Sequence, residues 1–378
     1  MGHRVVRDES DSLPFDFCSE FDSPATIEAI ASALRLGGHA VHLVEANEDL
    51  PRWFLTHDVD LAFNIAEGTT GPHRESQVPA VLESLGIPCT GSSSLTLALA
   101  LDKTRTKQLL ASDGVPTPSW QLFTTPDAIV DSRLTFPLIV KPNCEGSAKG
   151  ILRESVVRDE ASLRRQVRRV VERYRQEALV EEFIEGTELT VGVLGNEDAQ
   201  ALPILEIDFS ACQGSGEFFY SWRMKEYQGN AQLGLNPTFH CPARLGPAVA
   251  ARVQAVAVRA HQLLGCGGLS RTDIRLRRDG IPFVLEVNPL PGLDPVESNF
   301  PMMTSAAGIA YPALINRLVE FALARCRQAR LSRLPIGSVA KAGWDGGQAA
   351  QTQEPSVSLP VSILGDGQGE LAESRTAP

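Results

Sequence analysis

The chain has 378 residues, of which 43% are hydrophobic and 21% are charged, a composition typical of globular proteins rather than of disordered or fibrous ones. This length suggests two or three domains, because a domain usually has roughly 100 to 200 residues. The 46 acidic residues outnumber the 35 basic ones and give a formal net charge of −11, which argues against nucleic acid or an anionic membrane as the main partner.

The sequence also lacks the usual marks of export and membrane insertion. Its apolar runs are well below the roughly 18 to 20 residues that a transmembrane helix needs. The first nine residues turn acidic where a signal peptide would need an apolar core. The seven cysteines are scattered and form no C-x-x-C pair, which favours reduced thiols over disulfides or a zinc site. We therefore expect a cytoplasmic protein with no membrane and no nucleic-acid partner.

The first hundred residues alternate between helix-like and strand-like patterns. Ser23 and Pro24 precede an apolar stripe that ends at Gly37, which predicts a helix with an N-cap, a first-turn proline and a terminal glycine. Apolar strands are expected at 39–44 and 60–65, and a helix at 77–85. This alternation favours an open parallel sheet, so residues 1–100 are expected to form an α/β domain.

After the helix expected to end near residue 114, Pro116 and Pro118 indicate a linker, and a new unit begins there. The patterns predict strands at 136–142, 179–184 and 188–193, and helices at 101–114, 160–176, 247–264 and 311–327. From 331 to 378 Gly, Ser, Gln and Pro dominate, and we expect a disordered tail there. Residues 5–17, by contrast, show no clear first strand for the N-terminal sheet.

A β-hairpin is the most informative local prediction. The Asp-Gly pair at 279–280 lies between two alternating segments, a strong signal for a two-residue hairpin turn. Such a turn pairs Asp273 with Glu286 and Arg271 with Asn288, and the period of two places all four side chains on one face.

Two carboxylates and an amide oxygen on one face suit Mg²⁺, with Glu286 able to bridge two ions. The spacing alone leaves open a surface hairpin with an ordinary charge pair between Arg271 and Asp273.

Two further segments suggest nucleotide binding. A strand that ends at Lys141 opens into a glycine-bearing loop, 143–150, whose backbone N–H groups, hydroxyl and lysine suit phosphate. It is neither a P-loop nor a G-x-G-x-x-G turn, and an ordinary turn remains an alternative. Glu181 and Glu188, beside the apolar Phe183 and Ile184, could hold adenine and ribose, or could be a solvated strand edge.

In this order, these segments resemble the ATP-grasp superfamily and, within it, the D-alanine–D-alanine ligase family. The matching segments lie between about residues 20 and 325 and are 60–77, 86–92, 101–107, 136–150, 179–193, 219–225 and 269–292. The resemblance implies an ATP-dependent ligase that forms an amide bond between a carboxylate and an amine through an acyl phosphate. It also implies an N-terminal domain at 1–100, a central ATP-grasp subdomain with the phosphate loop at 101–192, and a C-terminal subdomain with the metal site at 193–330.

The resemblance assigns a role to each matching residue. The implied nucleotide-binding residues are Lys103, Lys141, Glu145, Gly146, Ser147, Ala148, Glu181, Phe183, Ile184, Glu188 and Lys225. The implied metal ligands are Asp273, Glu286 and Asn288, which would hold one or two Mg²⁺ ions, with Mn²⁺ as a substitute. The implied catalytic residues are Arg271, which would steady the tetrahedral intermediate, and Ser147 of the loop.

The amino-acid half matches less well. Glu67-Gly68 stands where the family has a His-Gly pair, Glu226 replaces an active-site tyrosine, and the segment with Glu297 is longer and acidic. Asp22 and Ser298 are the nearest counterparts of two substrate-binding residues. We therefore expect amino-acid or peptide substrates without naming them, and the protein could form a homodimer. Two alternative functions stay open: an authentic D-alanine–D-alanine ligase, and a catalytically silent ATP-binding regulatory protein.

Overall fold

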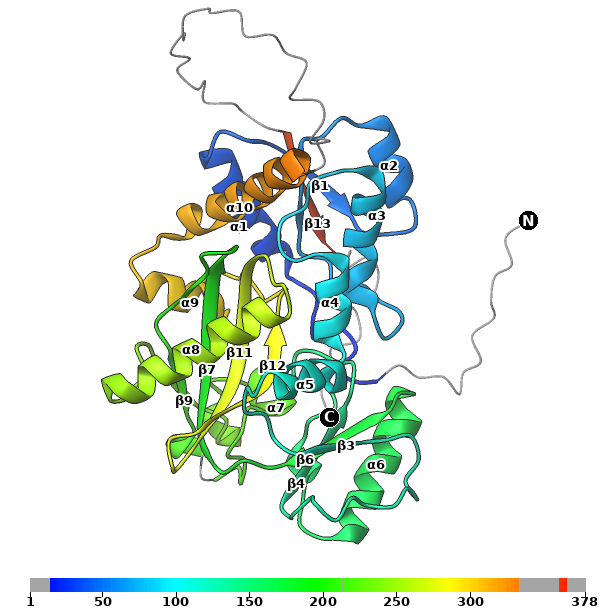
Figure 1. Cartoon of the computed structure of the whole chain (residues 1–378), viewed down its shortest axis with the longest axis vertical. Helices are drawn as coiled ribbons and strands as arrows, with labels where there is room; N and C mark the ends of the chain where they lie inside the picture. Colours follow the sequence, from blue (N-terminus) through cyan, green and yellow to red (C-terminus); the bar gives the residue numbers. More distant parts are fainter. Residues whose placement is uncertain (1–13, 213, 333–359, 366–378) are drawn as a thin grey trace, which may run out of the picture.

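The computed structural model describes residues 14–212, 214–332 and 360–365, which form three β-sheets with helices packed on them (Figure 1). One sheet is parallel and two are antiparallel. This arrangement agrees with the expected α/β fold class, an N-terminal parallel-sheet domain followed by a part of the chain with two further sheets.

The N-terminal sheet has three parallel strands in the order β1 (Ala40–Glu45), β13 (Pro360–Gly365) and β2 (Leu61–Asn64). One face packs against α1 (Pro24–Leu36) and α10 (Tyr311–Ser332), and the other against α2 (Leu50–Thr56) and α3 (Gln77–Leu85). Ser23 caps α1 as predicted, accepting a hydrogen bond from the Thr26 N–H group.

The expectation of a disordered tail is wrong for residues 360–365. This segment pairs with β1 over residues 360–365 and with β2 over residues 361–364, and the hydrogen bonds and buried side chains offset the entropy of ordering it. The rest of the expected tail beyond Ser332, and the first 13 residues of the chain, lie outside the described residues.

The second sheet is antiparallel, in the order β3 (Trp120–Phe123), β6 (Ala178–Glu182), β4 (Leu138–Pro142) and β5 (Val156–Val157). Helix α6 (Glu160–Tyr174) covers it and buries Leu163, Val167 and Val170, a stripe at helical spacing. A reciprocal capping pair between Asp159 and Ser162 starts this helix.

The third sheet follows the order β10 (Thr238–His240), β9 (Leu205–Asp208), β7 (Gly186–Gly195), β11 (Gly268–Arg277) and β12 (Pro282–Asn288), with β8 (Gln200–Ala201) paired to β7. Helix α8 (Pro247–Leu263) packs on one face and α9 (Asn299–Ala306) contacts β7. Since β7 pairs with β9 and β11, the boundary expected after residue 192 divides a strand of this sheet; the topology places it between β6 and β7.

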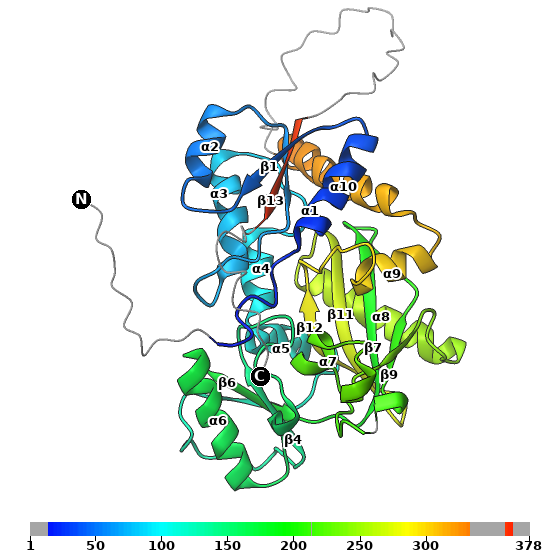
Figure 2. The ribbon, with the colours of Figure 1, turned by 180° about the vertical axis from the view of Figure 1, so that it is seen from behind.

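The remaining helices join these units. Helices α4 (Ser94–Leu101) and α5 (Lys103–Ser112) lead from the N-terminal domain to the second sheet, and α7 (Trp222–Glu226) follows β9 (Figure 2). Within the described part of the chain, no single helix is long and apolar enough to cross a membrane; α9 and α10 pass that test only as a pair bent by 103°.

Candidate functional site

The hairpin of β11 and β12 has the predicted pairing at its functional end but not at its turn. Asp273 lies opposite Glu286 and Arg271 opposite Asn288, as the sequence predicts. Towards the turn the register shifts by one, so that Ile274 faces Val284. The loop therefore has one residue more than the predicted two-residue turn, and a bulge at Leu285 restores the pairing at the site.

The four side chains contact one another. The Arg271 guanidinium donates to both carboxylate oxygens of Asp273, at 3.0 and 2.9 Å. Asn288 Nδ2 donates to Asp273 Oδ2 at 3.1 Å, and Thr190 Oγ1 donates to Asp273 Oδ1 at 2.6 Å. The side chains predicted to bind metal therefore lie together in the folded chain. The charge pair between Arg271 and Asp273, which the sequence left open as an alternative, is present as well.

Glu286 links this hairpin to α5. Its Oε2 atom lies 3.0 Å from Lys103 Nζ, and the same ammonium donates a hydrogen bond to the backbone carbonyl of Glu145. Burial raises the pKa of Glu286, but the charges of Lys103, Lys141 and Arg271 outweigh it and hold the pKa well below its usual value. Glu286 is therefore an ionised carboxylate, as a metal ligand must be.

Burial raises the pKa of the Asp273 carboxyl, and the neighbouring Glu286 charge adds to this, while Arg271 opposes it. Two close carboxylates with a raised pKa on one of them are favourable for a cation, which would relieve their repulsion. The donor set of Asp273, Glu286 and Asn288, all oxygen-bearing, fits Mg²⁺. In the described residues no group of three or more His, Cys, Asp and Glu side chains has a metal-binding arrangement, so such a site rests on two carboxylates and an amide.

Lys141 belongs to a buried charge triad. Glu181 accepts from Lys141 at 2.5 Å and forms an ion pair with Lys107 at 2.7 Å, and it is only 1% exposed. Burial lowers the pKa of Lys107 to about 8, and Glu181 offsets this only in part. Glu181, expected beside adenine, is thus engaged with two lysines, and the Lys107 partner was not predicted.

The phosphate loop closes towards α7. Lys225 Nζ donates to Ser147 Oγ at 2.8 Å, which brings together two residues that the resemblance implies. Ser147 and Ala148 have φ angles of 49° and 57°, a left-handed conformation that side chains rarely adopt. Such backbone strain is concentrated at ligand-binding segments, and here it is held by contacts on both sides of the loop.

A cluster that the sequence analysis did not identify supports this loop. Glu20 accepts from the Gly146 N–H group at 2.8 Å, from Lys149 at 2.6 Å and from Arg74 at 2.7 and 2.8 Å. Arg74 also lies 3.1 Å from Glu145 and is 5% exposed. Burial raises the pKa of Glu20, but Arg74 and Lys149 outweigh it and lower the pKa overall. The three parts come from distant segments, so only the residue types, not their contact, were visible in the sequence.

Two further carboxylates, Glu67 and Glu75, lie near this cluster. Burial raises the pKa of Glu67 well above its usual value, and the charges of Glu75 and Glu20 add to the rise. Burial and Glu20 also raise the pKa of Glu75, to about 7. The replacement of the family's His-Gly pair by Glu67-Gly68 therefore places an acid in an already acidic, buried environment.

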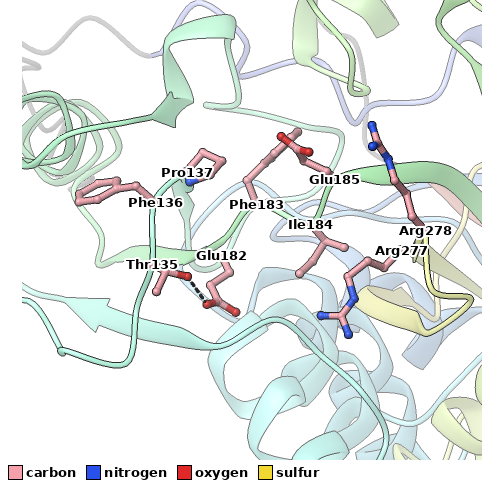
Figure 3. Close-up of a pocket in the computed structure, with 9 residues that line it drawn as sticks. All are labelled: Thr135, Phe136, Pro137, Glu182, Phe183, Ile184, Glu185, Arg277 and Arg278. Carbon is pink, nitrogen blue, oxygen red and sulfur yellow. Dashed lines mark hydrogen bonds between the residues drawn. The ribbon is translucent and has the colours of Figure 1, made fainter.

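The predicted adenine residues are only partly together. Phe183 and Ile184 line a pocket of about 320 Å³ between β6, β7 and the hairpin loop (Figure 3). Glu188 lies elsewhere, where it pairs with Arg275 at 3.0 Å and accepts from the Tyr220 N–H group. Arg277, at the end of β11, also lines the pocket. It lies four residues beyond Asp273, so the pocket is about 13 Å along the strand from the hairpin site.

The weaker candidates have other contacts. Ser298 precedes α9, and its Oγ accepts from the Asp294 N–H group. Burial raises the pKa of the Tyr220 phenol and Arg271 opposes this, while Glu188, Asp273 and, last, Glu297 add to the rise.

Comparisons with known proteins agree with this geometry. The family model "D-ala D-ala ligase C-terminus" matches residues 109–320. A D-alanine–D-alanine ligase of Pelotomaculum thermopropionicum is 33% identical over 80% of this chain and 92% of its own length. Crystal structures of similar fold include a Bacillus anthracis D-alanine–D-alanine ligase complexed with ATP (27% identity, TM-score 0.65, 81% of this chain and 94% of that one) and the Enterococcus faecalis VanG D-Ala:D-Ser ligase (27%, 0.59, 70% and 74%).

The fold and the clustered lysines, arginine and carboxylates define an ATP-grasp enzyme, a ligase that forms carbon–nitrogen bonds at the expense of ATP. Within that class the chain belongs to the D-alanine–D-alanine ligase family.

Proposed function

We propose that this ligase activates the carboxylate of an amino acid or short peptide with ATP and joins it to an amine that is not restricted to D-alanine. The observation that carries this proposal is the convergence of Asp273, Glu286 and Asn288 on one face of the hairpin, with Lys103 bonded to Glu286. Such an arrangement brings lysine side chains and metal ligands together, as binding of a triphosphate requires.

The nucleotide would extend along β11. Lys103, Lys141 and Lys225 would contact its phosphates, and the loop with Ser147 would close over them. Phe183 and Ile184 would supply an apolar surface for the base, which is supported by their place in the pocket at the far end of the strand. Glu181 then acts through Lys141, whose ammonium it orients at 2.5 Å.

Asp273, Glu286 and Asn288 would hold one or two Mg²⁺ ions, with Mn²⁺ as a substitute. When bound, the metal neutralises charge on the phosphate oxygens. Two carboxylates and an amide on neighbouring strands of the hairpin favour Mg²⁺, because this ion accepts few protein ligands and shares the rest with phosphates and water.

The reaction would proceed in two steps. A substrate carboxylate oxygen attacks the γ-phosphorus, the bond from this phosphorus to the ADP oxygen breaks, and an acyl phosphate forms. The neutral amine nitrogen then attacks the acyl carbon, phosphate leaves with the former carboxylate oxygen, and the nitrogen loses a proton to solvent to give the amide. Arg271 would stabilise the tetrahedral oxyanion, and the closed loop would exclude water that hydrolyses the acyl phosphate.

The substrate proposal rests on the excess of carboxylates. Glu75 is buried and Glu67 half-buried near Glu20, where Arg74 offsets only part of the rise in their pKa values, and Glu297 lies in the acidic segment just before α9. An amine-rich or cationic substrate would offset their mutual repulsion. The second candidate is D-alanine as both substrates, which is favoured by the D-alanine–D-alanine ligases at 33 to 36% identity.

The experiment is a screen for phosphate release with the purified enzyme, ATP, Mg²⁺ and amino acids of both configurations, tested singly and in pairs. Release that requires two substrates, one of them basic, supports the first candidate; release with D-alanine alone supports the second. Asp273→Asn should abolish release in either case. Phosphate release that never depends on an amine contradicts the ligase mechanism itself.

We also propose a cytoplasmic location and, as the simplest assembly, a homodimer. The seven cysteines are all free thiols, as suits a reducing compartment. Light scattering of the full-length chain measures the assembly directly.

A further inference from the structure

The central strand of the N-terminal sheet comes from the far end of the chain. In the described residues β1 and β2 do not pair with each other; β13 lies between them and is parallel to both (Figure 2). Its partners along β1 run from Ala40 to Glu45, and along β2 from Leu61 to Asn64. Without β13 the two strands have no common hydrogen-bonded neighbour.

The side chains of β13 fill the interior on both faces of this sheet. Val361 and Ile363 pack into the cluster formed with α1 and α10, and Leu364 into the cluster formed with α2 and α3. None of these three residues is more than 2% exposed. A strand buried on both faces is an integral part of a sheet and not an edge addition.

The end of β13 is bonded to the segment that leads into the active site. The Ile65 N–H group donates to the Leu364 carbonyl at 2.9 Å, and the Ala46 N–H group donates to the Gly365 carbonyl at 2.9 Å. Glu67 follows Ile65 by two residues, and the loop continues to Arg74, which binds Glu20. In parallel sheets, ligands bind at the carboxyl ends of the strands, which is where this loop leaves.

We propose that β13 is a positioning element: residues 360–365, docked between β1 and β2 of the same chain, hold the loop of Glu67 and Arg74 in place and so assemble the substrate half of the active site. The nucleotide half does not depend on it, because Lys103, Lys141 and the hairpin belong to α5 and the two antiparallel sheets. The role of Glu67 in substrate binding rests on the proposed function; the docking of the strand does not.

The first test compares Ile363→Glu, which puts a charge into the buried face, with the conservative Ile363→Val. Leu43→Glu is the matched control, since Leu43 lies on the neighbouring strand and is 52% exposed. Ile363→Glu should speed amide hydrogen exchange in residues 61–74 by about tenfold or more and lower substrate-dependent phosphate release to a similar degree. The Kd for ATP should stay within about twofold. Ile363→Val and Leu43→Glu should behave as wild type.

Unchanged exchange in residues 61–74 of Ile363→Glu would overturn the proposal, and so would loss of ATP binding in parallel with turnover, because both halves would then depend on the strand. If wild type releases no phosphate with any amino acid, the proposed function fails, but exchange and ATP binding still test the strand.

A second test holds even if Ile363→Glu does not fold. Ser362 and His42 are partners in the register, so Ser362→Cys with His42→Cys should oxidise to a disulfide within one chain. Ser362→Cys with Glu45→Cys, three residues off register, should not. A missing cross-link, or a cross-linked dimer, would contradict docking of the strand in its own chain.

Discussion

Lys103 Nζ lies 3.0 Å from Glu286 Oε2 and so joins the first turn of α5 to the part of β12 that carries the proposed metal ligands. Lys103 and a metal ion would therefore compete for the same carboxylate. Lys103→Met should strengthen binding of Mg²⁺ alone and weaken binding of Mg-ATP by about tenfold or more, because one phosphate contact is lost. Calorimetric titration with MgCl₂ and with Mg-ATP measures both.

The control is Arg105→Met, two residues further along α5 and exposed. It should leave both affinities as in wild type. Equal Mg²⁺ affinity in Lys103→Met and wild type would mean that the ion pair does not compete with the metal.

The buried triad around Glu181 predicts a stability effect. Glu181→Ala leaves Lys107 and Lys141 without their shared carboxylate, and removing one partner of a buried charge set usually costs about 3 to 5 kcal/mol. Denaturant unfolding should show a loss of this size. Glu182→Ala, one residue later, removes a carboxylate that accepts from Thr135 Oγ1 at the surface and should cost far less. Similar losses in the two variants would refute the role of the triad.

Glu75 predicts how stability depends on pH. Its pKa is raised from 4.5 to about 7, so the folded state keeps a proton that the unfolded state releases between these values. The free energy of unfolding must then fall as pH rises from about 4.5 to about 7, by up to about 3 kcal/mol. Glu75→Gln should remove this fall, so that the variant is more stable than wild type at pH 8 and similar to it at low pH.

Thermal unfolding across that pH range tests this, with the exposed Glu28→Gln as the control. A Glu75→Gln variant that is less stable than wild type at pH 8 would show that the carboxylate is needed in its charged form.

Arg74 ties three segments together and so predicts a change in loop dynamics. Arg74→Gln removes its bonds to Glu20, Glu145 and the Cys144 carbonyl, which should free the loop 143–150. Amide exchange there should rise, and substrate-dependent phosphate release should fall by about tenfold, while the Kd for ATP should stay within about twofold because Lys103 and Lys141 keep their places on α5 and β4. Arg74→Lys, which keeps the charge but not the fork of donors, should be intermediate. Wild-type exchange in Arg74→Gln would show that the order of the loop does not depend on Arg74.

The part of the site that could be predicted from the sequence is the hairpin of β11 and β12, because its pattern is local in the chain. Alternation and an Asp-Gly turn signal correctly predicted that Asp273 lies opposite Glu286. The loop has one residue more than predicted, and the bulge at Leu285 compensates for it by one residue. Neither is encoded by a local signal of its own, since bulges depend on how neighbouring strands twist.

The parts that were missed are contacts between distant segments. Nothing in the sequence near Glu181 indicates Lys107, and Glu20, Arg74 and Lys149 meet only in the folded chain. Strand β13 was missed because a six-residue apolar run within a stretch of Gly, Ser and Gln gives no periodicity of its own. Its two partner strands, more than 290 residues earlier in the sequence, decide its conformation.

The most direct test of the central claim is the fate of the substrate carboxylate oxygen. Amino acids labelled with ¹⁸O in the carboxylate are incubated with the enzyme, ATP and Mg²⁺. The ¹⁸O content of the released phosphate is then measured by mass spectrometry. If the substrate carboxylate is activated by phosphoryl transfer at the hairpin site, each released phosphate should carry one ¹⁸O atom. The Asp273→Asn variant should release no labelled phosphate. Unlabelled phosphate formed together with an amide product would contradict the acyl-phosphate account.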